Sequence, residues 1–269
     1  PTRVTTRGVG AGILADNADN LVLRAMRATA DQLGGTLPAV DLTLDNAVPL
    51  AAGLGSSSTA VVAGVLIAGE LIASGLTSDD ALELATAIEG HPDNAAPALL
   101  GGLTIAVMTG SRVHALRLEP PADLQLIVVT PAMQQSTAEA RARLPALVPF
   151  ADAVANVGRS ALLVGALLQG RFDLLDVAMA DRLHQHVRAA PVPGLIDALA
   201  AARSAGAASS AVSGAGPSAI AYVDRRTGLA EAIGAAMQAA FAAAGLAATV
   251  RVIAPRLTGA TVSREETTA

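Results

Sequence analysis

The feature that most constrains the fold is a glycine- and serine-rich segment between two apolar ones. Residues 40–45, VDLTLD, alternate apolar and polar side chains, as a strand with one buried face does. The segment 49–59, PLAAGLGSSST, follows and runs directly into an apolar stretch that ends near Ser74. This order predicts a strand, a glycine loop and a helix whose first turn is built from hydroxyl residues.

The glycine loop has the composition of an anion site. Gly53 and Gly55 allow close approach of a ligand to the backbone, and unpaired N–H groups at a helix start, together with the positive end of its dipole, attract phosphate. The alternative is an ordinary capped helix after a tight turn, for which one glycine and one serine would suffice. Four consecutive hydroxyl residues, 56–59, exceed that need, so the loop predicts phosphate binding.

Two missing residue types exclude whole classes of chemistry. The chain has no cysteine, which excludes thiolate nucleophiles, iron–sulfur clusters and thiolate zinc sites, and all 18 of its basic residues are arginine. Without lysine there is no phosphate-loop lysine and no Schiff base. The sequence also lacks G-x-S-x-G and H-E-x-x-H, and its glycine loop is not G-x-G-x-x-G. Phosphates would then be held by backbone dipoles, hydroxyls, arginine and Mg²⁺.

Charge and hydropathy limit the partners. The net charge is −5, and the aromatic residues are one tyrosine and three phenylalanines. The sequence therefore indicates neither the basic surface nor the row of stacking side chains with which proteins bind nucleic acid. The uncharged stretches 46–69 and 232–250 are broken by proline and glycine or consist mostly of alanine, so we expect no membrane span. The start of the chain has no apolar signal region. We expect a cytoplasmic protein. The sequence leaves open whether it forms a homodimer.

A polar cluster follows the next predicted helix, which Thr77 begins and Gly90 ends. Glu89 lies in its last turn, where the helix dipole disfavours an anion, and this position suggests a functional carboxylate that could ligate Mg²⁺ with a serine hydroxyl. An exposed acid at a frayed end is the alternative. His91, Asp93 and Asn94 follow in a turn and could be binding residues or simple turn and cap residues.

The second half supplies further candidates. Thr137 and Arg141 are four residues apart on a predicted helix and could together meet a carboxylate or phosphate, while Ser136 and Glu139 cap that helix. Arg188 could bind an anion or complement a helix end. A metal site at His184 and His186 is rejected, because residues two apart on a helix point in different directions. Gly214 and Gly216 form a second glycine loop, either a plain hairpin turn or a partner that approaches the first loop closely.

The order of elements predicts an α+β protein of two domains, 1–121 and 122–269, with the boundary in 109–123. After a strand at 124–130 we expect helices at 149–168, 172–189 and 194–205, strands at 208–212 and 218–223, a helix at 227–244 and a strand at 247–253. This β, helices, β, β, α, β order suits a ferredoxin-like α/β sandwich.

At this point the motifs resemble a known family. Pro49-x-x-x-Gly-Leu-Gly-Ser-Ser-Ser and Ser213-Gly-Ala-Gly-Pro-Ser resemble the second and third motifs of the GHMP kinases. Glu89-Gly-His-Pro-Asp-Asn, Ser136-Thr-Ala-Glu-Ala-Arg and Arg188 before Pro193-Gly194 resemble the homoserine kinases of that superfamily. The resemblance extends from Asn20 to about Val262. It implies a two-domain fold, with a left-handed βαβ nucleotide loop in the first domain, and transfer of the ATP γ-phosphoryl group to L-homoserine in threonine biosynthesis.

The resemblance also implies roles for individual residues. Ser57 and Glu89 would lie near Mg²⁺, although which of the serines 56–58 ligates is open, and Asn94 would lie near the reacting hydroxyl. His91, Asp93, Thr137, Arg141, Arg188, Gly214 and Gly216 would bind homoserine, with the arginines facing its carboxylate and Asp93 its ammonium group. The nucleotide would contact Asn20, Pro49, Leu50, Ala51, Ala52, Gly53, Leu54, Gly55, Ser56, Ser57, Ser58 and Thr59.

One family feature has no counterpart here. The first motif, an N-terminal strand and loop that contributes to the homoserine pocket, does not precede Pro1. We therefore expect an N-terminal piece with one or two strands to be missing. Two alternatives stay open: another small-molecule GHMP kinase, and a non-catalytic relative that binds nucleotide or amino acid as a sensor.

Overall fold

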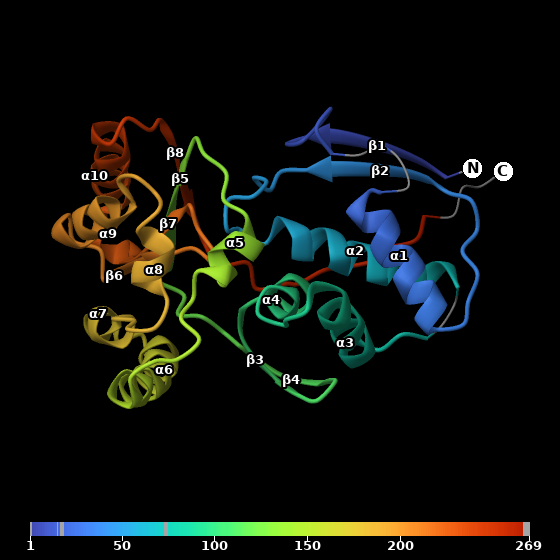
Figure 1. The fold of residues 1–269 in the computed structure, drawn as a ribbon, viewed down its shortest axis with the longest axis horizontal. Helices are drawn as coiled ribbons and strands as arrows, with labels where there is room; N and C mark the ends of the chain where they lie inside the picture. The colour runs from blue at the N-terminus through green and yellow to red at the C-terminus, as the bar shows by residue number, and fades with distance from the viewer. Residues whose placement is uncertain (1, 15, 17–18, 73–74, 266–269) are drawn as a thin grey trace. The chain divides into compact units, whose positions relative to one another are not determined.

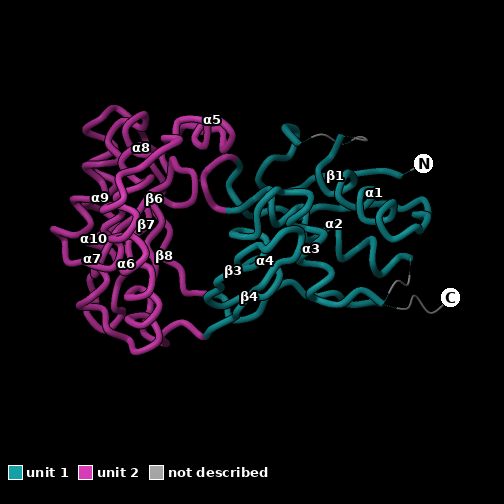
Figure 2. Tube along the Cα trace, turned by 60° about the horizontal axis from the view of Figure 1, so that its bottom comes forward, with its two compact units in different colours: residues 1–50, 55–118, 256–269 teal, residues 51–54, 119–255 magenta. Residues whose placement is uncertain are grey.

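The computed structural model describes residues 2–14, 16, 19–72 and 75–265 (Figure 1). The chain divides into two compact units, coloured separately in Figure 2: residues 1–50, 55–118 and 256–269 form the first, and residues 51–54 and 119–255 form the second. The sequence predicted contiguous domains, 1–121 and 122–269. The structure differs because the chain returns to the first unit at residue 256, and because four residues of the glycine loop pack with the second.

The first unit begins with a parallel strand pair, β1 (Arg3–Gly8) and β2 (Asp41–Asn46), which the helix α1 (Leu21–Gln32) connects. Asn20 caps α1 by accepting the Val22 N–H at 3.0 Å. The sequence predicted α1 and β2 but not β1. Gly34 has φ +66° beyond the end of α1, as expected of a left-handed C-cap.

Three helices and a hairpin complete this unit. They are α2 (Ser56–Leu71), α3 (Ser78–Glu89), α4 (Ala95–Leu100), β3 (Leu103–Thr109) and the antiparallel β4 (Arg112–Leu118). The expected capping box forms at α3, where the Thr77 side chain accepts from the Asp80 N–H and the Asp80 carboxylate accepts from Thr77. Strand β4 was not predicted, since 109–123 was expected to be a boundary. The predicted end of α2 near Ser74 lies outside the described residues.

The C-terminal return strengthens the first unit. The Gly102 N–H donates to the Arg256 carbonyl at 2.8 Å, and the Ala260 N–H donates to the carbonyls of Ala98 and Leu99 at the end of α4. A Cβ on Gly259 would lie 2.0 Å from the Leu99 carbonyl oxygen, so this backbone contact requires glycine. The segment 256–260 is thus held by main-chain contacts.

The second unit is a four-stranded antiparallel sheet of order β6-β7-β5-β8 with helices packed against it. Its elements are β5 (Leu124–Pro131), α5 (Thr137–Ala142), α6 (Phe150–Leu168), η1 (Phe172–Leu174), α7 (Leu175–Ala178), α8 (Gln185–Ala189), α9 (Leu195–Ser204), β6 (Ser209–Val212), β7 (Ala219–Asp224), η2 (Arg225–Thr227), α10 (Ala230–Ala243) and β8 (Ala248–Ile253). The predicted order of β, helices, β, β, α, β is confirmed. The single helix expected at 172–189 is wrong, because the backbone leaves the helical path between α7 and α8.

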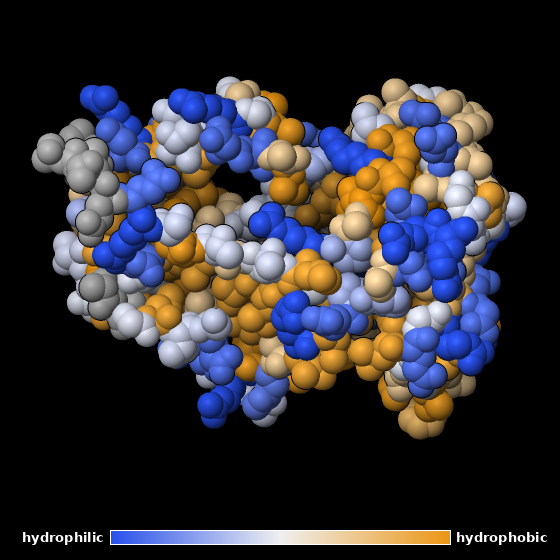
Figure 3. Space-filling model, turned by 180° about the vertical axis from the view of Figure 1, so that it is seen from behind, coloured by the Kyte–Doolittle hydropathy of each residue, from blue (hydrophilic) through white to orange (hydrophobic). Residues whose placement is uncertain are grey.

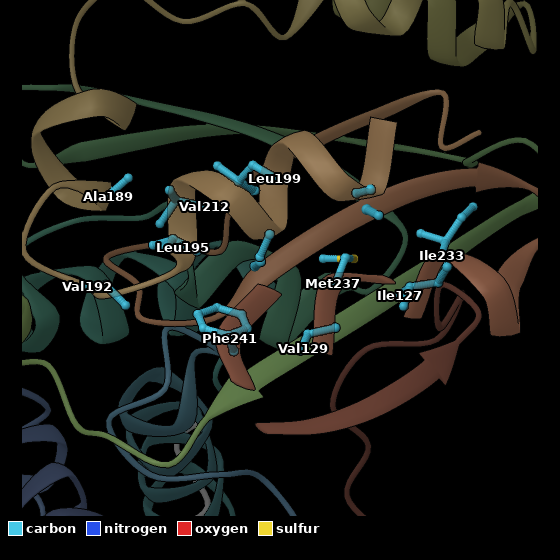
Figure 4. Close-up of a cluster of buried hydrophobic side chains, with 14 of the residues drawn as sticks. Ile127, Val129, Ala189, Val192, Leu195, Leu199, Val212, Ile233, Met237 and Phe241 are labelled. Carbon is cyan, nitrogen blue, oxygen red and sulfur yellow. The ribbon is translucent and has the colours of Figure 1, made fainter. Parts of the chain in front are cut away.

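The core of this unit lies between the sheet and the helices α9 and α10 (Figure 4). Leu195 of α9 and Met237 and Phe241 of α10 are completely buried against Ile127 and Val129 of β5. Met237 and Phe241 are four residues apart on α10, so both point to the sheet. Large apolar side chains from three elements therefore fix β5 against α9 and α10.

Helix α6 differs from the other helices of the described residues because it is long and apolar enough, by length and composition, to cross a membrane. Only 11% of its apolar window is buried. The sequence arguments considered other stretches, since Asp152 and Arg159 interrupt this one. Length and hydropathy alone do not distinguish a membrane helix from one that packs on protein.

Candidate active site

The start of α2 provides unpaired backbone donors. Its N-cap is Gly55, in the left-handed region at φ +74°, and no side chain caps the helix. Thr59 turns its hydroxyl back to the Gly55 carbonyl at 3.1 Å, so it stabilises the first turn and leaves the leading N–H groups uncapped. A helix start of this kind can accept an anion.

Two serine hydroxyls of α2 meet the carboxylate that ends α3. Ser58 donates to Glu89 Oε2 at 2.7 Å and Ser57 donates to the same oxygen at 3.3 Å. Ser58 is 1% exposed, while Glu89 is half-buried beside Gly90, which ends α3 with φ +83°. Three hard oxygen donors therefore gather beside the α2 N-terminus, and this is the ligand type that Mg²⁺ prefers.

The polar turn after α3 lies against the same helix start. His91 Nδ1 contacts Asp93 Oδ1, and the Asn94 amide donates to the same Asp93 oxygen at 3.4 Å. A Cβ on Gly55 would lie 3.6 Å from Asn94 Oδ1, which places the Asn94 amide next to the loop. The first unit thus brings Gly55, Ser57, Glu89 and Asn94 together.

In the second unit, the two glycine loops touch backbone to backbone. The Ser213 hydroxyl donates to the Gly53 carbonyl at 2.9 Å. A Cβ on Gly53 would lie 2.1 Å from the Ser213 carbonyl oxygen, and one on Gly214 would lie 3.0 Å from the Gly53 oxygen. Of the two readings left open for the loop at Gly214 and Gly216, the close approach to the first loop is the one observed.

Gln135, two residues before the start of α5, lies near this contact. The Gln135 N–H donates to the Ala51 carbonyl at 3.3 Å, and its buried side-chain oxygen lies 3.3 Å from the Cβ position of Gly216. Ser136 caps α5 by accepting the Glu139 N–H at 3.4 Å, as expected. Thr137 and Arg141 both lie exposed on this six-residue helix.

Arg188 is tied to the second glycine loop, since its Nη1 donates to the Gly214 carbonyl at 2.8 Å. Its helix, α8, is anchored by Asp181, whose carboxylate accepts the N–H groups of His184 and Gln185 at 2.7 and 2.6 Å. Gln185 in turn accepts the Val212 N–H at 2.9 Å. These bonds end the helical path before α8 and orient the segment that bears Arg188.

The Asp181 anchor is charged. Burial would raise the pKa of Asp181, but the N–H donors of Gln185 and His184 and the amide of Asn156 outweigh it and hold that pKa to about 2. Burial lowers the pKa of His184, and Arg188 and His186 lower it further while Asp181 opposes them. Protonating His184 would thus work against the positive charge of Arg188.

Other predicted site residues lie at the start of α1 and in the segment that leads into the glycine loop. Asn20 is buried and its side-chain oxygen caps α1, as described above. Pro49 and Leu50 end the first-unit part of the chain that leads into the loop, and Ala51 has φ +49° at the point where the loop joins the second unit. No group of three or more His, Asp and Glu side chains within the described ranges could hold a metal ion.

Sequence reasoning missed three residues that shape this region. Ser213 was recognised as part of a motif but not as a contact, and Asp181 and Gln135 were not considered. Asp181 had a signal, because an aspartate followed within four residues by further polar residues can cap a helix start. Gln135 had none, since its burial depends on the glycine loops.

Comparison with known proteins identifies the class. The model of the GHMP kinase N-terminal domain matches residues 20–102, and the model of the GHMP kinase C-terminal domain matches residues 163–243. The first match contains the glycine loop from residue 49 to 59 and the polar turn after α3, and the second contains Arg188 and the second glycine loop. The chain therefore belongs to the GHMP kinases.

The more similar relatives are homoserine kinases. That of Moorella thermoacetica is 40% identical over 255 residues, which cover 95% of this chain and 85% of the relative. That of Deinococcus radiodurans is 46% identical over 77% of this chain and 67% of its own length. The crystal structure of the Cytophaga hutchinsonii homoserine kinase superposes with a TM-score of 0.84 at 30% identity, covering 96% of this chain and 84% of that one. Within the GHMP kinases, the chain groups with the homoserine kinases.

Proposed function

We propose that the chain transfers the terminal phosphoryl group of ATP to the side-chain hydroxyl of L-homoserine, giving O-phospho-L-homoserine and ADP in threonine biosynthesis. The observation that carries the site assignment is the convergence of Ser57, Ser58 and Glu89 beside the uncapped start of α2. The similarity to homoserine kinases supports the choice of substrate.

The glycine loop is the proposed phosphate cradle. Its N–H groups and the dipole of α2 would face the triphosphate, with the hydroxyls of residues 56–59 as additional donors. The glycines keep the loop free of side chains where Gly53 meets Ser213 and where Gly55 meets Asn94. Because the chain has no lysine, the cradle neutralises phosphate charge without an ammonium group.

The residues beside the cradle fit a magnesium ion. Glu89 together with Ser57 or Ser58 would hold it, and their hard oxygen donors match its preference. When bound, Mg²⁺ supplies charge neutralisation to the phosphates. Glu89 and the serines also position one another without it, because their hydrogen bonds are present in the structure.

The homoserine-binding residues are proposed from the family match. Asp93 would face the ammonium group of homoserine with His91 beside it, and Asn94 would orient its hydroxyl. Thr137, Arg141 and Arg188 would bind the carboxylate, where a charge-assisted contact is strong. The family pattern includes no dedicated aspartate base, so we propose that positioning and charge neutralisation account for the rate.

The architecture has corresponding proposed roles. The N-terminal unit would be the ATP-binding domain, with the family's left-handed βαβ nucleotide loop, and the C-terminal unit a ferredoxin-like sandwich, which its sheet order β6-β7-β5-β8 supports. From the similarity to homoserine kinases we also propose a cytoplasmic location.

An assay of ADP release with homoserine, threonine, mevalonate and shikimate tests the proposal. We expect turnover with homoserine and kcat/KM at least about 100-fold lower with each of the others. Mevalonate and shikimate have no ammonium group for Asp93, and the threonine hydroxyl is on Cβ, one carbon short of the position of the homoserine hydroxyl. Turnover restricted to mevalonate would establish another GHMP kinase. Tight ATP binding without turnover of any substrate would favour a sensor.

A further inference from the structure

Gln135 is a buried polar residue whose side chain the fold leaves unpaired. It is 7% exposed, and both polar atoms of its side chain, Nε2 and Oε1, are buried. Neither atom has a hydrogen-bond partner among the residues that the structure describes. Glutamine normally lies at the surface, where water bonds to both groups, and Figure 3 shows many hydrophilic residues on such a surface. The neighbouring Gln134 is exposed, so the burial is particular to residue 135.

A buried amide without partners destabilises the fold. An unpaired buried donor or acceptor loses its hydrogen bonds to water and gains none in return, whereas an apolar side chain of the same shape loses nothing. Methionine at position 135 would therefore suit the folded chain better than glutamine does. The glutamine needs a reason other than the stability of the fold, and a bound molecule that pairs with the amide supplies one.

The position of Gln135 limits what that molecule can be. The Gln135 N–H donates to the Ala51 carbonyl at 3.3 Å, so the backbone of residue 135 is fixed to the first glycine loop. The side-chain oxygen Oε1 lies 3.3 Å from the Cβ position of Gly216, so a side chain at residue 216 would crowd the amide. All three residues belong to the second unit. The amide therefore lies where the two glycine loops of the candidate site meet.

The groups around Gln135 favour a carboxylate over a phosphate. Arg188 is tied to the second glycine loop, since its Nη1 donates to the Gly214 carbonyl at 2.8 Å. Thr137 begins α5 two residues after Gln135. Both Arg188 and Thr137 are proposed to bind the carboxylate of homoserine. The first loop, by contrast, presents a carbonyl oxygen to Gln135 at Ala51, and the N–H groups proposed to face the triphosphate belong to α2 in the first unit.

We propose that Gln135 is a substrate-binding and specificity-determining residue whose side-chain amide pairs with the amino-acid head group of the substrate. The inference rests on the proposed function, because it takes homoserine as the substrate. Nε2 donates to a carboxylate oxygen, and Oε1 accepts from the ammonium group on the same carbon. The head group thus supplies a partner for each of the two unpaired atoms. A hydroxy acid or a simple amine supplies only one, so Gln135 favours a free amino acid as the substrate.

Gln135→Met tests the proposal, because methionine has nearly the size of glutamine and lacks its amide. In the full chain we expect the homoserine KM to rise about 10- to 100-fold, with kcat and the ATP KM within about twofold of wild type. Urea unfolding should show a stability equal to or above that of wild type, because the variant removes an unpaired buried amide. Gln134→Met is the matched control: Gln134 is exposed, and this variant should leave both KM values unchanged.

A second measurement locates the contact within the substrate. L-2-aminobutyrate has the head group of homoserine without its hydroxyl, so it should inhibit the enzyme in competition with homoserine. Its inhibition constant should rise in Gln135→Met by the same factor as the homoserine KM. An inhibition constant that stays at the wild-type value while the homoserine KM rises would place Gln135 at the hydroxyl and contradict the proposal.

Other results would also overturn the proposal. An unchanged homoserine KM in Gln135→Met with unchanged stability would mean that water alone pairs with the amide, and an unchanged KM with lower stability would mean that the amide only supports the loops. A rise in the ATP KM would place Gln135 at the phosphates. Each of these contradicts the inference alone as long as the wild-type chain phosphorylates homoserine. A wild-type chain that does not phosphorylate homoserine would contradict the proposed function itself and the inference with it.

Discussion

The glycine loop is held by different forces in its two parts. In the second unit, Gly53 packs peptide against peptide on the loop of Ser213 and Gly214. In the first unit, Ser57 and Ser58 are held by side-chain hydrogen bonds to Glu89. The backbone contact depends on missing Cβ atoms and tolerates no substitution, whereas the side-chain contact can change its chemistry and keep its shape. We therefore expect a substitution at Gly53 to lower the stability of the fold, and a substitution at Glu89 to lower activity with little loss of stability.

The largest expected effect is that of Gly53→Ala. The added Cβ meets the Ser213 carbonyl oxygen at 2.1 Å in a backbone region that disfavours alanine, so we expect a loss of more than about 3 kcal/mol of stability together with most activity. Chemical unfolding measures the loss of stability, and kcat/KM measures the loss of activity. Gly245→Ala is the control: Gly245 has φ +80° with nothing within 4 Å, so only the conformational cost of about 1–2 kcal/mol should remain. Equal losses in both variants would show that the loop contact is not rigid.

Glu89→Gln tests the chemical half of the comparison. The amide keeps an oxygen for the two serines but loses the negative charge, so we expect kcat to fall about 100-fold and the Mg²⁺ requirement to rise, with a stability change under about 1 kcal/mol. Steady-state kinetics over a magnesium titration measure this. Glu83→Gln on the same helix should have no kinetic effect. An unchanged metal dependence in Glu89→Gln would remove Glu89 from the site.

Arg141→Ala tests whether the second unit also supplies a side chain to the substrate. Loss of a charge-assisted contact to the carboxylate should raise the homoserine KM about 10- to 150-fold and leave the ATP KM nearly unchanged. Arg143→Ala removes a neighbouring guanidinium that pairs with Glu139 and serves as the control. A collapse of ATP affinity instead would contradict the placement of α5.

The smallest effect is expected from Asp181→Asn, which tests whether a half-buried charge positions the backbone near Arg188. The pKa of Asp181 is lowered from 3.8 to about 2 in the folded chain, so its stabilising effect is full above pH 5 and is lost as the pH falls through 3.8 toward 2. At pH 7 the variant should lose about 1–2 kcal/mol. Urea unfolding should show the gap to wild type shrinking between pH 5 and pH 3. A gap independent of pH would mean that packing, not charge, sets the role of Asp181.

Elements with local signals were predicted from the sequence. Helix α3 is an example, because Thr77 and Asp80 close the capping box and Gly90 ends the helix, all within the element itself. Strand β1 was missed, since its evidence is the pairing of residues 3–8 with residues 41–46. The continuous helix expected at 172–189 failed because the Asp181 carboxylate takes the N–H groups that a helix would have used.

The candidate site also combines features that the sequence predicts with features that only the fold shows. Glycine spacing suggested that the two loops could meet, and the contact of Gly53 with Gly214 is observed. The burial of Gln135 could not be predicted from the sequence, because the residues that cover it are remote in sequence. The sequence equally does not show whether an apolar helix faces a core or the outside, and the exposure of Phe150 and Val157 on α6 is visible only in the fold.

By itself, the sequence determined the capped helices, the hydroxyl-rich loop and the absence of a lysine that could hold a phosphate, because these depend on short-range bonding and on which functional groups are present. Only the tertiary structure decided which groups meet: Ser213 with Gly53, 160 positions away, and Ser58 with Glu89, 31 positions away. The physical reason is that contacts between distant segments form when whole elements pack, and the energy of that packing is shared among many residues.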